Sequence, residues 1–237
     1  MNNKIVYLLK NTEKDLALFE RSIKSLVENF LPWNDCSICV FHEGIDHHWF
    51  SNIKSKYAIK LTDATIQFQI PSFLNSSSIP EKILIPNTVL QFGMGYRHMC
   101  RFFSGTIYEH PLMLETDYYL RLDNDSSITS PVTYNIFEKM KTLDAVYGYN
   151  HLTIDNPVVV DGLWEACVDY ARDKHVYSKP FQDLKFPYMY YTNFEVGKTS
   201  WFREEGYQGF FKHIDNAGGI YTKRWGDAPI KYLGIGM

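Results

Sequence analysis

The chain has 237 residues, 45% of them hydrophobic, which is enough to bury the core of a single globular domain spanning residues 1–237. Its formal net charge is −3, and its 24 basic residues are interspersed among 27 acidic ones, so the composition argues against a nucleic-acid partner. The apolar run at residues 5–9 is far shorter than the roughly 20 residues of a membrane span and too short for a signal peptide, so we expect no transmembrane segment and a cytoplasmic location.

The first elements alternate between strand and helix. Residues 4–9, which are apolar after Lys4, predict a buried strand, and apolar residues at helical spacing from Leu16 to Phe30 predict a helix capped by Asn11 or Thr12. Residues 36–41 predict a second strand. Strand, helix and strand in this order form the unit of a parallel sheet covered by helices, so the sequence predicts an α/β fold.

The remaining elements are marked by turn residues and apolar periodicity. Prolines and serines between residues 62 and 87 predict an irregular excursion that borders a binding cleft. We expect further helices over residues 96–103, 135–143, 162–173 and 200–216, strands over residues 117–122 and 145–149, and a loop over residues 179–187.

Two carboxylates follow the predicted strand at residues 117–122. An enzyme that cleaves a nucleotide sugar must neutralise the charge that develops on the departing diphosphate. Hard cations such as Mn²⁺ or Mg²⁺ prefer oxygen ligands, and Asp123 and Asp125 would lie at the carboxyl edge of the sheet, where ligands bind in α/β folds. The same residues also suit a plain turn, so the triplet alone leaves both interpretations open.

A third carboxylate, Glu195, follows several aromatic residues and is expected to be partly shielded from water. A positioned carboxylate can attack or stabilise an anomeric carbon while the diphosphate leaves. The alternative is a structural ion pair of Glu195 with Arg203 or Arg224.

A fourth carboxylate, Asp227, lies between Gly226 and Ala228-Pro229 in a predicted tight turn beside Trp225. An aromatic face next to a carboxylate suits a pyranose ring, although an aspartate that caps a turn before proline has the same pattern.

Tyr96 and Arg97 open the predicted helix at residues 96–103, with Gly93 and Gly95 ahead of them. A helix start behind glycines is a natural place for a phosphate group. A structural ion pair explains Arg97, or Arg101 one turn further on, equally well.

Six blocks together resemble the fungal α-1,2-mannosyltransferases of glycosyltransferase family 15. The order and approximate spacing of the blocks agree with that family, and the similarity extends from the first strand to Pro229. The blocks are residues 96–105, 110–112, 118–125, 193–197, 217–219 and 224–229.

This resemblance implies a GT-A type nucleotide-sugar transferase fold with a mixed central sheet flanked by helices. It also implies GDP-mannose as the donor, Mn²⁺ as the cation, transfer with retention of the anomeric configuration, and a mannose-containing or other sugar as the acceptor. Mg²⁺ is the alternative cation.

The resemblance also implies roles for single residues. Asp123 stands where the family has a glutamate in its Glu-Pro-Asp motif, and Asp125 matches the aspartate of that motif. Glu195 matches the candidate nucleophile, while Tyr96 and Asp227 match an active-site tyrosine and aspartate.

The expected roles fall into four groups. They are catalysis by Glu195 and Asp227, donor binding by Tyr96, Arg97 and Asp123, acceptor binding by Trp225, and metal binding by Asp123 and Asp125.

The sequence departs from the family pattern at three places. Family members carry an amino-terminal membrane anchor and work in the Golgi lumen, whereas this sequence begins almost at its first strand, so we expect a microbial or viral cytosolic setting. The family's metal-binding histidine, in an Ile-Gly-Tyr-His segment, has no equivalent before Met237. The cation is then held by Asp123, Asp125, diphosphate and water alone, or activity is reduced or lost. Aspartate in place of glutamate at position 123 shortens the reach to the cation.

Two other functions remain open at this point. A glycoside hydrolase also uses two carboxylates that flank a sugar bond, and it needs no metal. A catalytically silent sugar- or nucleotide-binding protein is the second alternative.

Overall fold

The computed structural model describes residues 1–176 and 179–237 and divides into two compact units. We call the first the sheet unit; it consists of Met1–Gln67, Pro111–Tyr149 and Thr192–Ser200. We call the second the helical unit; it consists of Phe68–His110, Asn150–Tyr191 and Trp201–Met237. The chain therefore passes from one unit to the other five times. The prediction of a single domain over residues 1–237 stays a prediction.

The sheet unit is built on one six-stranded mixed sheet with the strand order β3-β2-β1-β6-β10-β7. The neighbours β3, β2, β1 and β6 pair in parallel, and β10 pairs antiparallel with both β6 and β7. The family resemblance predicts this mixed central sheet, and the residues alone predict its parallel part. The strands are β1 (Lys4–Leu9), β2 (Ser37–His42), β3 (Leu61–Thr65), β6 (Tyr118–Leu122), β7 (Tyr147–Tyr149) and β10 (Phe194–Lys198).

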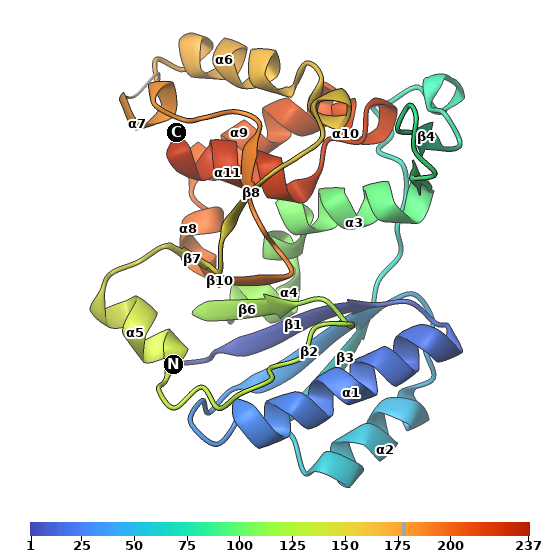
Figure 1. The fold of residues 1–237 in the computed structure, drawn as a ribbon, viewed down its shortest axis with the longest axis vertical. Helices are drawn as coiled ribbons and strands as arrows, with labels where there is room; N and C mark the ends of the chain where they lie inside the picture. Colours follow the sequence, from blue (N-terminus) through green and yellow to red (C-terminus); the bar gives the residue numbers. More distant parts are fainter. Residues whose placement is uncertain (177–178) are drawn as a thin grey trace. The chain divides into compact units, whose positions relative to one another are not determined.

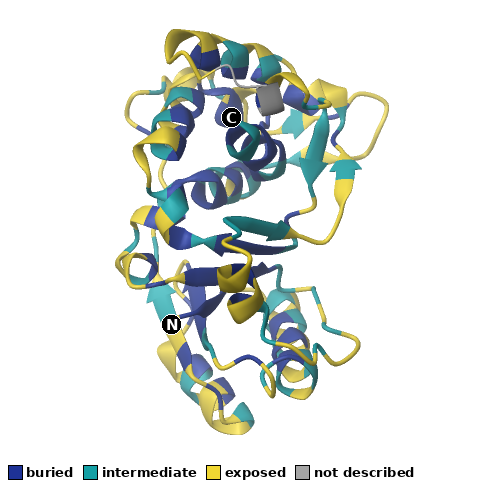
Figure 2. Ribbon diagram, turned by 90° about the vertical axis from the view of Figure 1, so that its left-hand side faces the viewer, coloured by how far each residue is buried: buried dark blue, intermediate teal, exposed yellow. Residues whose placement is uncertain are grey.

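One face of this sheet carries the main apolar core. Alternate residues of the strands, such as Ile5, Leu120 and Val196, are buried there against three helices. These helices are α1 (Glu13–Asn29), α2 (His47–Tyr57) and α5 (Ile136–Thr142). Figure 1 shows α1 and α2 side by side beneath the strands, and Figure 2 shows the same helices exposed on their outer sides and the sheet buried. The apolar face of α1, formed by side chains at helical spacing, thus packs against the alternate apolar side chains of the strands.

The opposite face of the same sheet carries polar side chains. Because successive side chains of a strand point to opposite faces, Tyr119 and Arg121 of β6 lie opposite the core residues of their strand. The register places Glu195 of β10 directly across from Arg121 on one side and Tyr149 of β7 on the other. The mixed polarity of β6 therefore has a structural reason: one face of the sheet packs on the apolar core, and the other face carries polar side chains.

The helical unit packs helices around aromatic side chains. Tyr108 and Phe202, for example, stack with their ring centroids 4.5 Å apart, and Tyr207 lies edge-on to Phe202 at 4.8 Å. Its longer helices are α3 (Met94–Ser104), α6 (Leu163–Asp173), α9 (Glu205–Asn216) and α11 (Asp227–Gly236). Shorter elements are β4 (Ile83–Leu84), β5 (Gln91–Phe92), η2 (Thr106–Glu109), β8 (Leu152–Ile154), η3 (Pro157–Val160), α7 (Lys179–Gln182), β9 (Tyr188–Tyr190) and α10 (Gly219–Thr222).

The remaining short elements are η1 (Ser76–Ser78), α4 (Pro111–Leu114) and α8 (Thr199–Phe202). The helix predicted over residues 200–216 is in fact two helices, α8 and α9, because the chain turns at Arg203 and Glu204. The loop predicted over residues 179–187 contains the short helix α7. Within residues 1–176 and 179–237, none of the helices combines the length and the apolar character needed to cross a bilayer.

Candidate functional site

Asp123 and Asp125 follow β6 directly, at the edge where the parallel strands β1, β2 and β6 all end. A turn forms there, in which the Ser126 N–H donates to the Asp123 carbonyl at 2.9 Å. The Asp123 N–H donates in turn to the carbonyl of Asn193 at 3.3 Å, which joins this turn to the start of β10. The turn and the strand that carries Glu195 are therefore neighbours in the sheet unit.

The carboxylate of Asp123 lies next to a buried arginine. The guanidinium of Arg121 donates to Oδ1 of Asp123 from Nε at 3.3 Å and from a terminal nitrogen at 3.2 Å. The Arg121 side chain is 3% exposed, whereas that of Asp123 is 42% exposed. Arg121 thus orients Asp123 from the protein side, and the outer side of this carboxylate remains open to solvent.

Asp125 is exposed, and its surroundings hold its backbone rather than its carboxylate. Arg21 donates to the Asp125 carbonyl at 3.2 Å, and the Asn124 amide donates to Oδ1 of Asp15 at 2.8 Å. In the described part of the chain the Asp125 carboxylate has no hydrogen-bond or ion-pair partner. Two residues of α1 therefore hold the turn while the Asp125 carboxylate stays available to a ligand.

The donor set at this turn fits a hard divalent cation only in part. Asp123 and Asp125 supply carboxylate oxygens, which Mn²⁺ and Mg²⁺ prefer. Among the described residues, no group of three or more His, Cys, Asp or Glu side chains is arranged to hold a metal ion. Two carboxylates suit a cation whose other ligands are the oxygens of a bound diphosphate and water.

Glu195 lies on the polar face of the sheet, on β10, and is completely buried, whereas the sequence predicts partial shielding. The hydroxyl of Tyr147 donates to its Oε2 at 2.6 Å, and the hydroxyl of Tyr119 donates to its Oε1 at 3.2 Å. Each carboxylate oxygen thus has a phenol donor from a different neighbouring strand. This arrangement fixes the orientation of the carboxylate.

The register explains why both tyrosines reach the same carboxylate. Tyr119 and Tyr147 are both paired with Gly197, two residues beyond Glu195 on β10. Glycine has no side chain, so nothing on this face of β10 stands between the two rings, and each reaches diagonally to Glu195. Sequence reasoning missed both tyrosines, because only the pairing of distant strands reveals them.

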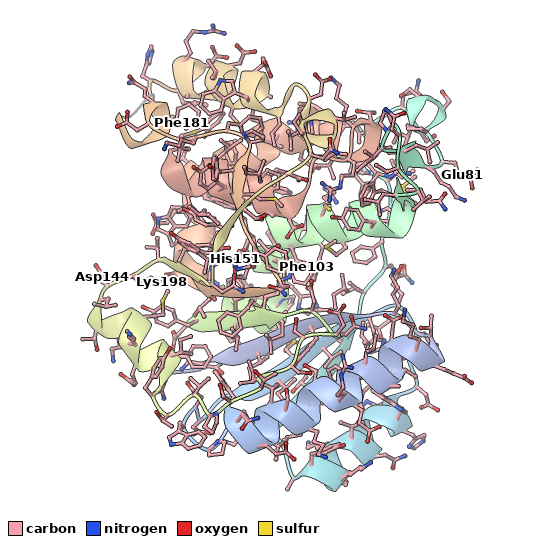
Figure 3. The ribbon with its side chains drawn as sticks, in the orientation of Figure 1. Glu81, Phe103, Asp144, His151, Phe181 and Lys198 are labelled. Atoms are coloured by element: carbon pink, nitrogen blue, oxygen red, sulfur yellow. The ribbon has the colours of Figure 1, made fainter. Side chains whose placement is uncertain are left out.

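Tyr96 and Arg97 occupy the first turn of α3 in the helical unit, as predicted. Arg97 is completely buried, and its terminal nitrogens donate to the carbonyls of Tyr221 at 2.6 Å and Glu81 at 2.7 Å (Glu81 is labelled in Figure 3). These contacts tie the start of α3 to two other segments. Its predicted role in donor binding stays a prediction.

The other arginine of α3 has a structural partner. Arg101 forms a bidentate ion pair with Asp215 of α9, in which Nε donates to Oδ1 at 2.9 Å and a terminal nitrogen donates to Oδ2 at 2.9 Å. The structural ion pair that the sequence leaves open for Arg101 is therefore present.

Tyr96 is half-buried and accepts a hydrogen bond at 2.6 Å from Arg224. Burial raises the pKa of Tyr96 well above its usual value, and the nearby carboxylates of Asp227 and Asp155 add to this, while Arg224 opposes it. Tyr96 therefore keeps its proton at physiological pH. Arg224 forms its ion pair with Asp155, at 2.8 Å, so it is not the structural partner considered for Glu195.

Asp227 is the first residue of α11 and is 4% exposed, so the tight turn predicted for it is in fact a helix start. An aspartate in the first helical turn interacts favourably with the helix dipole. One turn further along the same helix, Lys231 is completely buried, with its ammonium 5.9 Å from the Phe103 ring and 6.0 Å from the Phe202 ring. No pattern in the sequence indicates that this lysine is buried.

Trp225 is 4% exposed, and its indole N–H donates to the carbonyl of Asp161 at 2.8 Å. Its ring lies so close to Gly219 that a Cβ at that position would come within 2.2 Å of it. The indole is thus packed inside the helical unit, and its predicted contact with an acceptor sugar stays a prediction.

Comparison with known proteins finds mannosyltransferases as relatives of this chain. The family model described as "Glycolipid 2-alpha-mannosyltransferase" matches residues 1–237. "Probable mannosyltransferase MNT3" of Candida albicans is 35% identical over 148 residues, which cover 60% of this chain and 39% of that relative. "Probable mannosyltransferase KTR3" of Saccharomyces cerevisiae is 30% identical over 197 residues, which cover 78% of this chain and 48% of that relative. The chain thus spans less than half the length of these two relatives.

A solved structure shows the same fold. Core-mannan synthase A of Aspergillus fumigatus, crystallised in its Mn/GDP form, superposes with a TM-score of 0.88 at 22% sequence identity. The match covers 100% of this chain and 70% of that chain. The predicted GT-A type fold, with a mixed central sheet flanked by helices, is therefore confirmed.

Proposed function

The chain belongs to the glycolipid 2-alpha-mannosyltransferase family, and from this membership and the geometry of its carboxylates we propose that it is a retaining mannosyltransferase. It moves mannose from GDP-mannose to a mannose-containing or other sugar acceptor and depends on Mn²⁺. The names of the relatives support the mannosyl group, and the Mn/GDP form of the Aspergillus structure supports the nucleotide and the cation.

The observation that carries this proposal is the arrangement on the polar face of the sheet. Glu195 is buried between two phenol donors on β10, and the neighbouring strand β6 ends in Asp123 and Asp125. One carboxylate is thus fixed and shielded from water, while two others are solvent-accessible at the adjoining strand end. Retaining transfer needs this division, because one group must act at the anomeric carbon and others must bind the charged leaving group.

In the proposed reaction a carboxylate oxygen of Glu195 attacks the anomeric carbon of the donor. The bond from that carbon to the diphosphate oxygen breaks, and its electron pair leaves with GDP. An acceptor hydroxyl then attacks the same carbon, the bond to Glu195 breaks, and the hydroxyl proton passes to an oxygen of the departed diphosphate. Two inversions at one carbon give net retention. Tyr119 and Tyr147 keep the attacking oxygens oriented throughout.

Asp123 and Asp125 would hold the divalent cation together with the donor's phosphates. When bound, the cation supplies positive charge that stabilises the leaving diphosphate. Arg121 orients Asp123 by donating to one of its oxygens, so the pair presents the other side of the carboxylate outward. Mg²⁺ is the alternative cation, since it prefers the same oxygen ligands.

The helical unit supplies the remaining proposed roles. Tyr96 and Arg97 at the start of α3 serve the donor, Tyr96 by direct contact and Arg97 by fixing the helix start. Asp227 at the start of α11 serves catalysis by binding sugar hydroxyls, and Trp225 beside it serves the acceptor. These assignments follow the family resemblance residue by residue. A cytoplasmic location and a single domain also remain predictions.

A screen of nucleotide sugars tests the proposal. The full chain is incubated with each donor and a mannoside acceptor, with Mn²⁺ or with EDTA, and the products are separated by chromatography and their linkage configuration is read by NMR. We expect transfer from GDP-mannose alone, only with the cation, and with an α product. Glu195→Gln should lower transfer by more than about 10⁴-fold and leave GDP binding nearly unchanged.

A matched control is Asp144→Asn, which removes a carboxylate from an exposed ion pair with Lys198 at the other end of β10 (Figure 3). This variant should keep full transfer. Release of mannose from a mannoside without nucleotide or cation would instead indicate a glycoside hydrolase. GDP binding without any transfer would indicate a silent binder, and full turnover by Glu195→Gln would remove Glu195 from the mechanism.

A further inference from the structure

Arg224 of the helical unit combines strain with burial. Its φ is +69°, in the left-handed region that is costly for a residue other than glycine, and it is 9% exposed. A strained backbone of this kind is costly and persists where the surrounding contacts impose it. The surrounding contacts of Arg224 are those of its side chain with two aromatic rings, a carboxylate and a hydroxyl group.

The guanidinium of Arg224 is enclosed by two aromatic rings and anchored by one carboxylate. Its carbon lies 4.4 Å from the centroid of the Phe92 ring and 5.0 Å from that of the Tyr96 ring. One terminal nitrogen donates to Oδ2 of Asp155 at 2.8 Å, and the other donates to the Tyr96 hydroxyl at 2.6 Å. The other oxygen of Asp155 accepts from the Asn156 N–H at 2.8 Å, so the anchor is itself fixed.

The direction of the hydrogen bond between Arg224 and Tyr96 is not reversible. A guanidinium has donors only and stays charged, so the Tyr96 oxygen must accept. The hydroxyl proton of Tyr96 is then directed elsewhere, and no residue within 1–176 and 179–237 accepts it. Burial keeps this proton in place by raising the pKa of Tyr96. A hydroxyl that accepts from a cation is also a stronger donor than an isolated one.

We propose that Arg224 is a positioning residue that locks Tyr96 as a one-way hydrogen-bond donor to an oxygen atom of the bound nucleotide sugar. Asp155 and the Phe92 ring hold the guanidinium in place for this purpose. The inference rests on the proposed function, because the nucleotide sugar supplies the acceptor oxygen. Tyr96 can then bind only acceptor atoms of the ligand. The strength of this hydrogen bond depends on Arg224, which is 128 positions away in the chain.

A double-mutant cycle tests this role. Tyr96→Phe removes the hydroxyl, and Arg224→Lys keeps the positive charge but loses the planar fork that reaches Asp155 and Tyr96 from two nitrogens. We measure kcat/KM for transfer from GDP-mannose and the Kd of GDP by calorimetry, with thermal unfolding in parallel. Each single variant should lower kcat/KM by about 10- to 100-fold, as expected for the loss of a hydrogen bond to a charged group. In the Tyr96→Phe background, Arg224→Lys should add less than about a further twofold.

The matched control is Arg101→Lys on the same helix α3, which weakens the bidentate ion pair with Asp215. Its effect on kcat/KM should multiply with that of Tyr96→Phe, because it does not contact Tyr96. Asp155→Asn provides a second approach if Arg224→Lys does not fold: it releases the guanidinium from its anchor, and it should couple to Tyr96→Phe in the same way.

The outcomes separate the two proposals. If the wild-type chain transfers mannose and the losses from Arg224→Lys and Tyr96→Phe multiply as those of the control do, Arg224 has a structural role only and this inference is wrong. If the wild-type chain neither binds GDP nor transfers mannose, the proposed function fails, and with it the ligand assigned to Tyr96. Coupling of the two variants in an active chain supports the positioning role.

Discussion

The hydroxyl of Tyr147 on β7 donates to Oε2 of Glu195 on the neighbouring strand β10 across 2.6 Å. Tyr119 completes the arrangement from the strand on the other side of β10. A carboxylate in the middle of a sheet is thus held from both sides by elements that are far apart in the chain. This relationship makes the proposed nucleophile sensitive to changes on two other strands.

Replacing Tyr147 with phenylalanine removes one of these donors and keeps the ring. Because a hydrogen bond to a charged group contributes about 1.5–3 kcal/mol, we expect Tyr147→Phe to lower kcat by about 10- to 100-fold. GDP affinity should stay unchanged, since Asp123 and Asp125 are not affected. Steady-state kinetics and calorimetry measure both effects. The control is Tyr134→Phe in the same unit, whose residue is 51% exposed; equal losses in both variants would contradict the role of Tyr147.

Binding of the cation should depend on the nucleotide. With two carboxylates at the turn after β6, we expect Mn²⁺ alone to bind weakly and GDP to bind tightly only when Mn²⁺ is present. Asp125→Asn should weaken Mn²⁺-dependent GDP binding by about tenfold or more, because it removes a charged ligand. Calorimetry with GDP, with and without Mn²⁺, measures this. Asp35→Asn, which alters an exposed ion pair with Lys60 in the same unit, should change nothing; unaltered GDP binding by Asp125→Asn would count against the metal site.

The contact between Gly219 and Trp225 predicts a loss of stability on enlarging the glycine. A Cβ at position 219 would come within 2.2 to 2.4 Å of three atoms of the indole, so Gly219→Ala should lower the free energy of unfolding by about 1–3 kcal/mol. Gly206→Ala in α9 is the control, because nothing lies within 4 Å of its added Cβ, and it should raise stability by up to about 1 kcal/mol. Denaturation in urea gives both values. A Gly219→Ala variant as stable as the wild type would show that the indole can move aside.

Stability should depend on pH through His42 at the end of β2. This residue is 1% exposed, its Nδ1 accepts from the Ile45 N–H at 2.9 Å, and its ring packs on Phe50. Burial lowers the pKa of His42 below its ordinary value of 6.5, and Asp63 opposes this effect only in part. The unfolded chain therefore takes up the proton at a higher pH than the folded chain does. The contribution of neutral His42 is present above about pH 6.5 and is lost as the pH falls through its folded-state pKa.

The His42→Asn variant tests this dependence, because asparagine can keep the acceptor for Ile45 but does not titrate. Between pH 7.5 and 5, the free energy of unfolding should fall more steeply for the wild type than for His42→Asn. His47→Asn is the control, because His47 is 75% exposed and binds the same Asp63 from the surface. Parallel curves for wild type and His42→Asn would show that burial of His42 has no effect on stability.

The sequence pattern predicted those helices and strands in which the spacing of apolar residues coincides with the buried positions. The first strand lies at Lys4–Leu9, as expected, because every residue after Lys4 is apolar and all are buried except the half-buried Leu8. The helix with Phe19 and Ile23 on its buried face and the strand before Asp123 were also found, each within a few residues. These elements face one continuous core, so the sequence alone carries enough information to define them.

Long-range pairing could not be predicted in this way. The strand β10 was not recognised, because Glu195 and Gly197 interrupt its apolar pattern, and both residues lie on the polar face of the sheet. The helix α2, with its two leading histidines, and the edge strand β3 were missed because their apolar patterns are weak. The proposed catalytic carboxylate was found through the family resemblance, whereas its tyrosine partners needed the register of three strands.

The absence of a side chain at position 197 has a consequence for tracing this arrangement in other proteins. Tyr119 and Tyr147 are both paired with Gly197, and its bare backbone gives the two rings room to share one acid. A side chain at position 197 would lie on the same face as Glu195, between the two strands that carry these tyrosines. Comparing only acidic residues between distant sequences would therefore overlook the position, whereas a glycine two places after the glutamate, with a tyrosine on each adjoining strand, is a pattern that can be sought directly.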